Sequence, residues 1–112
     1  MVRKLGIIAL LVLTACAGPD ADEPGEDVFY DLGCQACHGD EDTTAGPTLS
    51  GLWGSEVLLE DGRTVTADEA YVRRAITDPQ AEVAAGFRTA MPQFPMTDSD
   101  LDLLVDYIRG LE

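Results

Sequence analysis

The chain has 112 residues, seven basic side chains against 21 acidic ones, and a formal net charge of −14. This length allows one domain, and such an acidic surface argues against binding to nucleic acid or to anionic lipid headgroups. The charge favours a protein partner with a basic docking patch, although acidity that serves only solubility is an equal alternative.

Residues 1–15 differ in character from the rest of the chain. Arg3 and Lys4 precede an apolar run over 5–13, which is too short to span a bilayer because a span needs about 20 residues. The pattern predicts a secretory signal peptide over 1–15. The run ends in Leu-Thr-Ala-Cys, which resembles the lipobox of bacterial lipoproteins, so Cys16 is predicted to be lipidated. An ordinary signal peptide with a spare Cys16 thiol is the alternative.

The next residues, 17–25, are acidic, contain two prolines and have no apolar side chain larger than alanine. With Cys16 they predict a lipidated N-terminus and flexible tether over 16–25, which leaves 26–112 for the folded domain. The protein is therefore expected to be exported and lipid-anchored, on the outer face of the cytoplasmic membrane or in the periplasm. The outer membrane is the alternative destination.

Three helices and one hairpin are predicted in the domain, with the helices over 26–35, 66–77 and 97–110 and the hairpin over 57–65. The first helix would place Cys34 and Cys37 at its C-terminal end. Thr66-Ala67-Asp68-Glu69 has the form of a capping box at the start of the second helix. Thr97 and Asp100 cap the third, which ends at Gly110. The predicted fold class is all-α, with a short hairpin and long loops.

The stretch Cys34-Gln35-Ala36-Cys37-His38 is the C-x-x-C-H attachment motif of c-type haem. Cys34 and Cys37 would form thioethers with the porphyrin, and His38 would be the proximal ligand of the iron. A structural zinc site needs four ligands, but His38 is the only histidine in the sequence. A thioredoxin-like redox pair would need a preceding strand, which the sequence does not predict. We therefore predict one covalent haem c.

The second axial position of the iron separates an electron carrier from an enzyme or gas sensor. With no second histidine, the candidate ligands are Met91 and Met96, the two methionines that follow the motif. Met91 lies in a long irregular segment over 80–95 and precedes Pro92, which would stiffen the backbone. Met96 precedes the cap Thr97 and has a packing role as a hydrophobic staple. Met91 is therefore the predicted ligand.

An apolar cluster among glycines follows the motif, formed by Pro47, Leu49, Leu52 and Trp53. Such irregular chain is expected to lie on the cofactor. The indole N–H of Trp53 would suit a haem propionate, and a role in core packing alone is the alternative.

Several stretches match one known family. They are Gly25, Phe29, the haem motif with Gly39, Gly46-Pro47-Thr48-Leu49, Gly51-Leu52-Trp53-Gly54, residues 61–71, Ile76-Thr77-Asp78-Pro79, Ala85-Gly86-Phe87, Met91-Pro92-Gln93-Phe94 and residues 104–108. The region from about 25 to 111 thus resembles a class I cytochrome c, and more narrowly the cytochrome c domain fused to subunit II of bacterial haem–copper oxidases. A lipoprotein-like leader stands where that family has a copper domain and a transmembrane hairpin.

The resemblance implies that His38 and Met91 are the axial ligands, and that the carbonyl of Pro47 accepts a hydrogen bond from the His38 ring. It also implies that the first and last helices cross near Gly25, Phe29 and Tyr107.

We therefore expect a membrane-tethered monohaem cytochrome that is not an enzyme. It would pass single electrons between respiratory redox partners and toward a terminal oxidase, with a haem–copper oxidase as the candidate partner, and it would be monomeric on its own. One alternative is a haem enzyme or a gas or peroxide sensor with a labile methionine ligand. Peroxide chemistry would need a histidine or arginine beside the open iron, and the sequence offers only Arg88 near Met91. The other is a non-catalytic cytochrome subunit of a larger dehydrogenase or oxidase complex.

Overall fold

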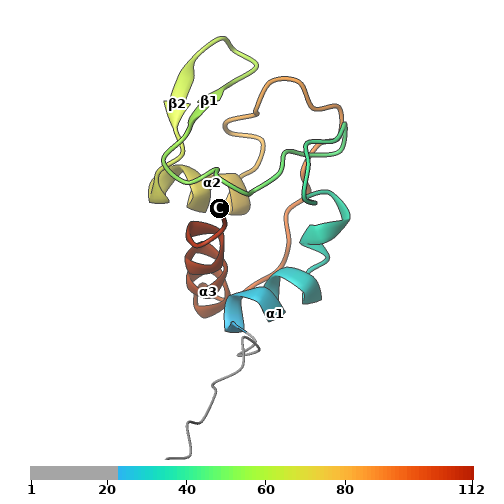
Figure 1. The fold of residues 1–112 in the computed structure, drawn as a ribbon, viewed down its shortest axis with the longest axis vertical. Helices are drawn as coiled ribbons and strands as arrows, with labels where there is room; N and C mark the ends of the chain where they lie inside the picture. Colours follow the sequence, from blue (N-terminus) through green and yellow to red (C-terminus); the bar gives the residue numbers. More distant parts are fainter. Residues whose placement is uncertain (1–22) are drawn as a thin grey trace, which may run out of the picture.

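The computed structural model describes residues 23–112, so the predicted signal peptide, Cys16 and most of the tether lie outside the described residues (Figure 1). Its helices are α1 (Pro24–Asp31), α2 (Glu69–Thr77) and α3 (Asp98–Arg109), with a 3-10 turn, η1 (Cys34–Ala36), after α1. Two short strands, β1 (Glu56–Leu58) and β2 (Thr64–Thr66), form the hairpin. The predicted fold class is confirmed, with the two-stranded sheet as a minor addition.

Helices α1 and α3 cross at a contact that leaves no room for a side chain at Gly25 (Figure 1). A Cβ at Gly25 would stand 2.6 Å from the Cβ of Tyr107 and would collide with the carbonyl oxygen of Leu103. One turn later, the ring of Phe29 packs on that of Tyr107 with 5.4 Å between centroids. The crossing predicted at Gly25, Phe29 and Tyr107 is confirmed.

The first helix is shorter and earlier than predicted, since it begins at Pro24 and ends at Asp31 instead of spanning 26–35. Proline suits the first position of a helix, where no backbone donor is needed. The helix stops because Gly33 takes a left-handed conformation with φ of 76°. Cys34 therefore begins the 3-10 turn η1 and Cys37 caps its end, so neither cysteine lies on the last turn of α1.

The hairpin is confirmed, with Val57 of β1 opposite Val65 of β2. The predicted capping box at 66–69 is wrong, because Thr66 belongs to β2 and the N-cap of α2 is Asp68. The Asp68 carboxylate accepts a hydrogen bond of 2.8 Å from the backbone N–H of Tyr71.

The third helix has the predicted caps. The Thr97 hydroxyl accepts a hydrogen bond from the Asp100 N–H at 3.1 Å, and the Asp100 carboxylate accepts one from the Thr97 N–H at 3.0 Å. The C-cap is Gly110, as predicted.

The core joins all three helices to the base of the hairpin. Its buried residues are Phe29, Leu59, Ala67, Tyr71, Val72, Ile76, Leu104, Val105 and Ile108. In Figure 1 the long loops arch away from this core on the side opposite the hairpin. Within residues 23–112, no helix has the length and apolar character needed to cross a bilayer.

Candidate functional site

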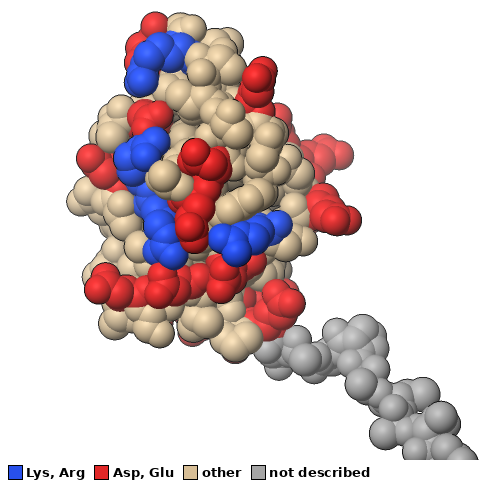
Figure 2. Space-filling model, turned by 90° about the vertical axis from the view of Figure 1, so that its left-hand side faces the viewer, with Lys and Arg blue, Asp and Glu red and all other residues tan. Residues whose placement is uncertain are grey.

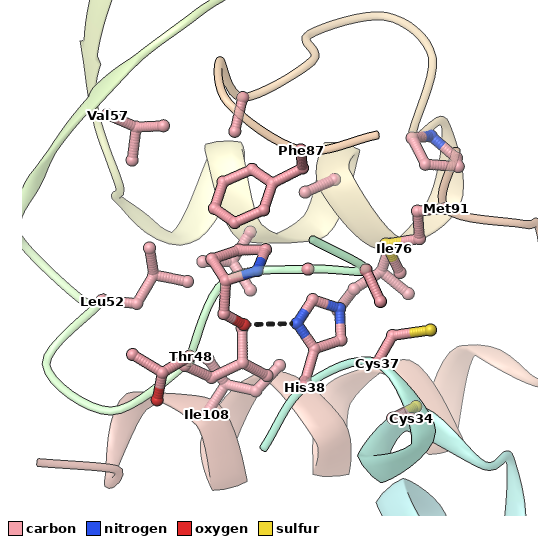
Figure 3. Close-up of a pocket in the computed structure, with 18 of the residues that line it drawn as sticks. Cys34, Cys37, His38, Thr48, Leu52, Val57, Ile76, Phe87, Met91 and Ile108 are labelled. Carbon is pink, nitrogen blue, oxygen red and sulfur yellow. Dashed lines mark hydrogen bonds between the residues drawn. The ribbon is translucent and has the colours of Figure 1, made fainter. Parts of the chain in front are cut away.

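A cavity of about 710 Å³ lies between the helices and the long loops (Figure 3). Its walls come from η1 and the following residues, the loop over 45–52, the inner faces of α2 and α3, and the segment over 79–94. Leu52, Val57, Ile76, Phe87 and Ile108 give it a mainly apolar surface. Its size falls within the range of about 300–1,000 Å³ that is usual for small-molecule and cofactor sites.

His38 lies in the cavity wall, and one of its two ring nitrogens already has a partner (Figure 3). Nδ1 lies 2.8 Å from the carbonyl oxygen of Pro47, so it must carry the proton and donate. This leaves the lone pair of Nε2 free for a metal, and the hydrogen bond sets the orientation of the ring. The hydrogen bond predicted between His38 and Pro47 is present.

The loop that carries Pro47 lies close against the His38 ring and is held there by its own hydrogen bonds. A Cβ at Gly46 would stand 3.0 Å from the Cys37 carbonyl oxygen and 3.3 Å from Cε1 of His38, so a side chain here would push the loop or the ring away by a few tenths of an ångström. The Asp42 carboxylate accepts a hydrogen bond of 2.8 Å from the Thr48 N–H, which closes the loop on itself. The family resemblance includes Gly46, but it did not reveal this steric role.

Cys34 and Cys37 are free thiols, are partly buried, and line the same cavity as His38. Burial raises the pKa of the Cys34 thiol, and a backbone hydrogen bond opposes this in part. The thiol form therefore dominates at neutral pH, which does not suit a thiolate nucleophile. Gln35 and Ala36 between them are exposed, so this edge of the cavity reaches the protein surface.

Both candidate methionines, Met91 and Met96, line the cavity and are partly exposed. Met96 also packs against the buried core, in line with its predicted packing role. Met91 lies in the segment over 80–95, which is irregular as predicted apart from a single β-bridge between Ala84 and Leu59.

Trp53 does not line the cavity. Its ring packs at the edge of the core and lies under the guanidinium of Arg109, with 4.5 Å between Cζ of Arg109 and the ring centroid. This position favours the packing alternative over a contact with a propionate.

The sequence did not predict a role for Glu82. Its side chain lines the cavity and is only 14% exposed. It is ion-paired with Arg74 at 2.7 Å. Burial first and the Glu82 charge second raise the pKa of Tyr71, which lines the cavity too. Tyr71 is one of the buried residues of α2. No local pattern in an irregular segment could have shown the position of Glu82.

The donors around the cavity suit an iron porphyrin. Two free thiols and an imidazole with a free Nε2 lie together in η1 and the residues after it, and thioether sulfurs lie elsewhere on the lining. Such a set, on apolar walls, matches covalent attachment and axial ligation of a haem. Within the described range, no three His, Cys, Asp or Glu side chains form a metal-binding group.

Comparison with known proteins agrees with this geometry. Among solved structures, the chain is similar to cytochrome cH from Methylobacterium extorquens, with 23% sequence identity and a TM-score of 0.55 over 77% of this chain and 94% of that one. At this identity the likeness shows the fold alone. No curated protein matches the chain. The family model for cytochrome c matches residues 23–112. The chain therefore belongs to the cytochrome c family, and it is an electron-transfer protein with covalently attached haem c.

Proposed function

We propose that this protein carries single electrons through one haem c that is attached at Cys34 and Cys37 and ligated by His38 and Met91. The observation that carries the proposal is the His38–Pro47 hydrogen bond of 2.8 Å, which leaves Nε2 of His38 free within an apolar cavity that Met91 also lines. When bound, the haem supplies reversible one-electron chemistry at its iron.

The residues of the chain would tune and limit that chemistry. The Pro47 carbonyl orients His38 and raises its basicity as a ligand. The apolar lining excludes water and disfavours the additional charge of the ferric state, and a thioether ligand from Met91 acts in the same direction. If His38 and Met91 both hold the iron, no coordination site would remain for a substrate, and electrons would pass through the exposed edge at Cys34 and Cys37.

The charge distribution supports a basic partner at that edge. Residues 23–62 include ten acidic side chains and no lysine or arginine. Within the described chain, all arginines except Arg88 are in ion pairs, namely Arg63–Asp61, Arg73–Asp102, Arg74–Glu82 and Arg109–Glu69. Figure 2 shows basic and acidic side chains interleaved on one face. None of the acidic side chains of α1 and of the loop at 40–42 has a cationic partner in the described chain, so these two neighbouring segments carry uncompensated negative charge. A redox protein with a basic patch, such as a respiratory haem–copper oxidase, would fit there.

The N-terminal region completes the proposal. An exported domain that is anchored by a lipid on Cys16, through the short tether ahead of α1, would meet a membrane-bound partner without long-range diffusion. Replacing Cys16 by serine tests this point, since the haem-loaded protein should then leave the membrane fraction for the soluble exported fraction. Retention of the Cys16→Ser protein in the membrane would refute the anchor.

The ligand assignment is tested by visible spectra of the mature, haem-loaded protein, oxidised and reduced, with and without carbon monoxide. A low-spin spectrum with the methionine–iron charge-transfer band, and no response to carbon monoxide, is expected. Met91→Ala should abolish that band, lower the reduction potential and admit carbon monoxide. The matched variant Met96→Ala should retain the band and lose only stability. The opposite pattern would assign the ligand to Met96, and ready binding of carbon monoxide by the native protein would favour an enzyme or sensor.

A further inference from the structure

The segment that carries Met91 has few hydrogen bonds of its own. Between Arg88 and the N-cap Thr97, no described residue takes part in a backbone–backbone hydrogen bond. Pro92 and Pro95 cannot donate one, since proline has no N–H. The backbone on either side of Met91 must therefore be held by something other than secondary structure.

Two glutamine side chains supply the hydrogen bonds that this segment does make. Nε2 of Gln80 donates to the carbonyl oxygen of Met91 at 3.3 Å, and Nε2 of Gln93 donates to the carbonyl oxygen of Thr77 at 3.2 Å. Thr77 is the last residue of α2, where carbonyl groups lack a partner within the helix. The two bonds run in opposite directions between the end of α2 and the Met91 segment. We call this pair, Gln80 and Gln93, the glutamine clamp.

The element to which the clamp is attached is well fixed. Helix α2 places Tyr71, Val72 and Ile76 in the buried core. Both glutamines are exposed, so their amide groups are not needed to fill space. Their hydrogen bonds tie a segment without secondary structure to the last residue of this helix, through Gln93, and to the turn that follows the helix, through Gln80.

We propose that Gln80 and Gln93 are positioning residues that hold the sulfur of Met91 at the metal. The inference rests on the proposed ligation by Met91, and it concerns how often that ligand leaves. When either amide is removed, the segment separates from α2 more often, and the sulfur leaves with it. Because one neutral hydrogen bond contributes modestly, each loss should raise the open population on the order of 3- to 10-fold. Both bonds hold the same segment, so the double variant should show coupling instead of a simple product.

The test uses the haem-loaded protein with Gln80→Ala, Gln93→Ala and both together. Two readouts are measured, the rate of carbon monoxide binding to the reduced protein and the rate of tryptic cleavage after Arg88, which begins the segment. Each single variant should increase both by about 3- to 10-fold. Gln80→Lys retains a donor and should restore slow cleavage. Ser99→Ala is the matched control, because Ser99 is exposed on the first turn of α3 and its side chain makes no hydrogen bond within the described residues.

Unchanged tryptic cleavage and carbon monoxide binding in both single variants would overturn the clamp, as would Gln80→Lys behaving like Gln80→Ala. Equal acceleration by Ser99→Ala would show a general loosening and would overturn it too. Failure of the proposed ligation is distinguishable, because the native protein would then lack the methionine charge-transfer band. In that case carbon monoxide binding no longer reports on Met91, and the rate of cleavage after Arg88 alone decides whether the glutamines hold the segment.

Discussion

Replacing Gly25 by alanine tests the crossing of α1 and α3. A Cβ at this position would stand 2.6 Å from the Cβ of Tyr107, whereas carbon atoms in favourable contact are about 3.5–4.0 Å apart. It would also collide with the carbonyl oxygen of Leu103, which belongs to the α3 backbone and cannot rotate away. The helices would have to separate by about 1 Å, which would loosen the packing of Phe29 on Tyr107.

The magnitude follows from two opposing effects. Overpacking of this kind costs about 1–3 kcal/mol, and the upper end applies because the neighbour is backbone. Alanine recovers about 0.5–1 kcal/mol through its higher helix propensity. We therefore expect Gly25→Ala to lose about 2 kcal/mol of unfolding free energy. For a domain of this size, that corresponds to a fall in Tm of about 8–16 °C.

The measurement is chemical denaturation of the haem-loaded protein, followed by far-ultraviolet circular dichroism, with the m-value as a check of two-state behaviour. Gly110→Ala is the matched control. Gly110 has φ of −81°, and its Cβ would come no closer than 3.5 Å to the Tyr107 carbonyl oxygen. That variant should be unchanged or stabilised by up to about 1 kcal/mol. Equal stability of Gly25→Ala and the native protein, or equal losses in the two variants, would refute the argument.

Three further predictions concern charge. Hydrogen bonds from Thr97, chiefly through its backbone N–H, lower the pKa of Asp100. The capping box therefore stabilises the fold at pH values above the pKa of Asp100 in the unfolded chain, and this contribution is lost as the pH falls through its pKa in the folded chain. Asp100→Asn should flatten this acid limb of a stability–pH curve, and an unchanged limb would contradict it. Arg109→Ala should lose about 1 kcal/mol in thermal unfolding through its contact with Trp53, whereas Arg88→Ala, with no ion pair in the described chain, should lose less than about 0.5 kcal/mol. The association rate with a basic redox partner, measured by stopped flow, should fall as the Debye length shortens from about 30 Å at 0.01 M salt to about 8 Å at 0.15 M, and a rate that does not depend on salt would argue against docking on the acidic side.

Local patterns predicted most of the secondary structure correctly because their physical causes are local. The capping box at Thr97 and Asp100 depends on residues three apart, and the hairpin depends on a turn between two short apolar stretches. The errors have local causes as well. Gly33 ended α1 before the haem motif. Thr66 pairs with Glu56 in the hairpin, so α2 begins later and its N-cap is Asp68. Apolar periodicity alone does not fix such boundaries.

The sequence by itself determined the cofactor chemistry, because Cys34, Cys37 and His38 are adjacent in the chain and their spacing alone brings two thiols and an imidazole together. Only the tertiary structure decided what surrounds them. It placed Trp53 under Arg109 and outside the cavity lining, and it brought Glu82 into that lining. It also joined Gln80 to Met91 and Gln93 to Thr77. These contacts join residues from separate elements through loops without a repeating pattern. Their partners are therefore set by how the helices pack, and not by their spacing along the chain.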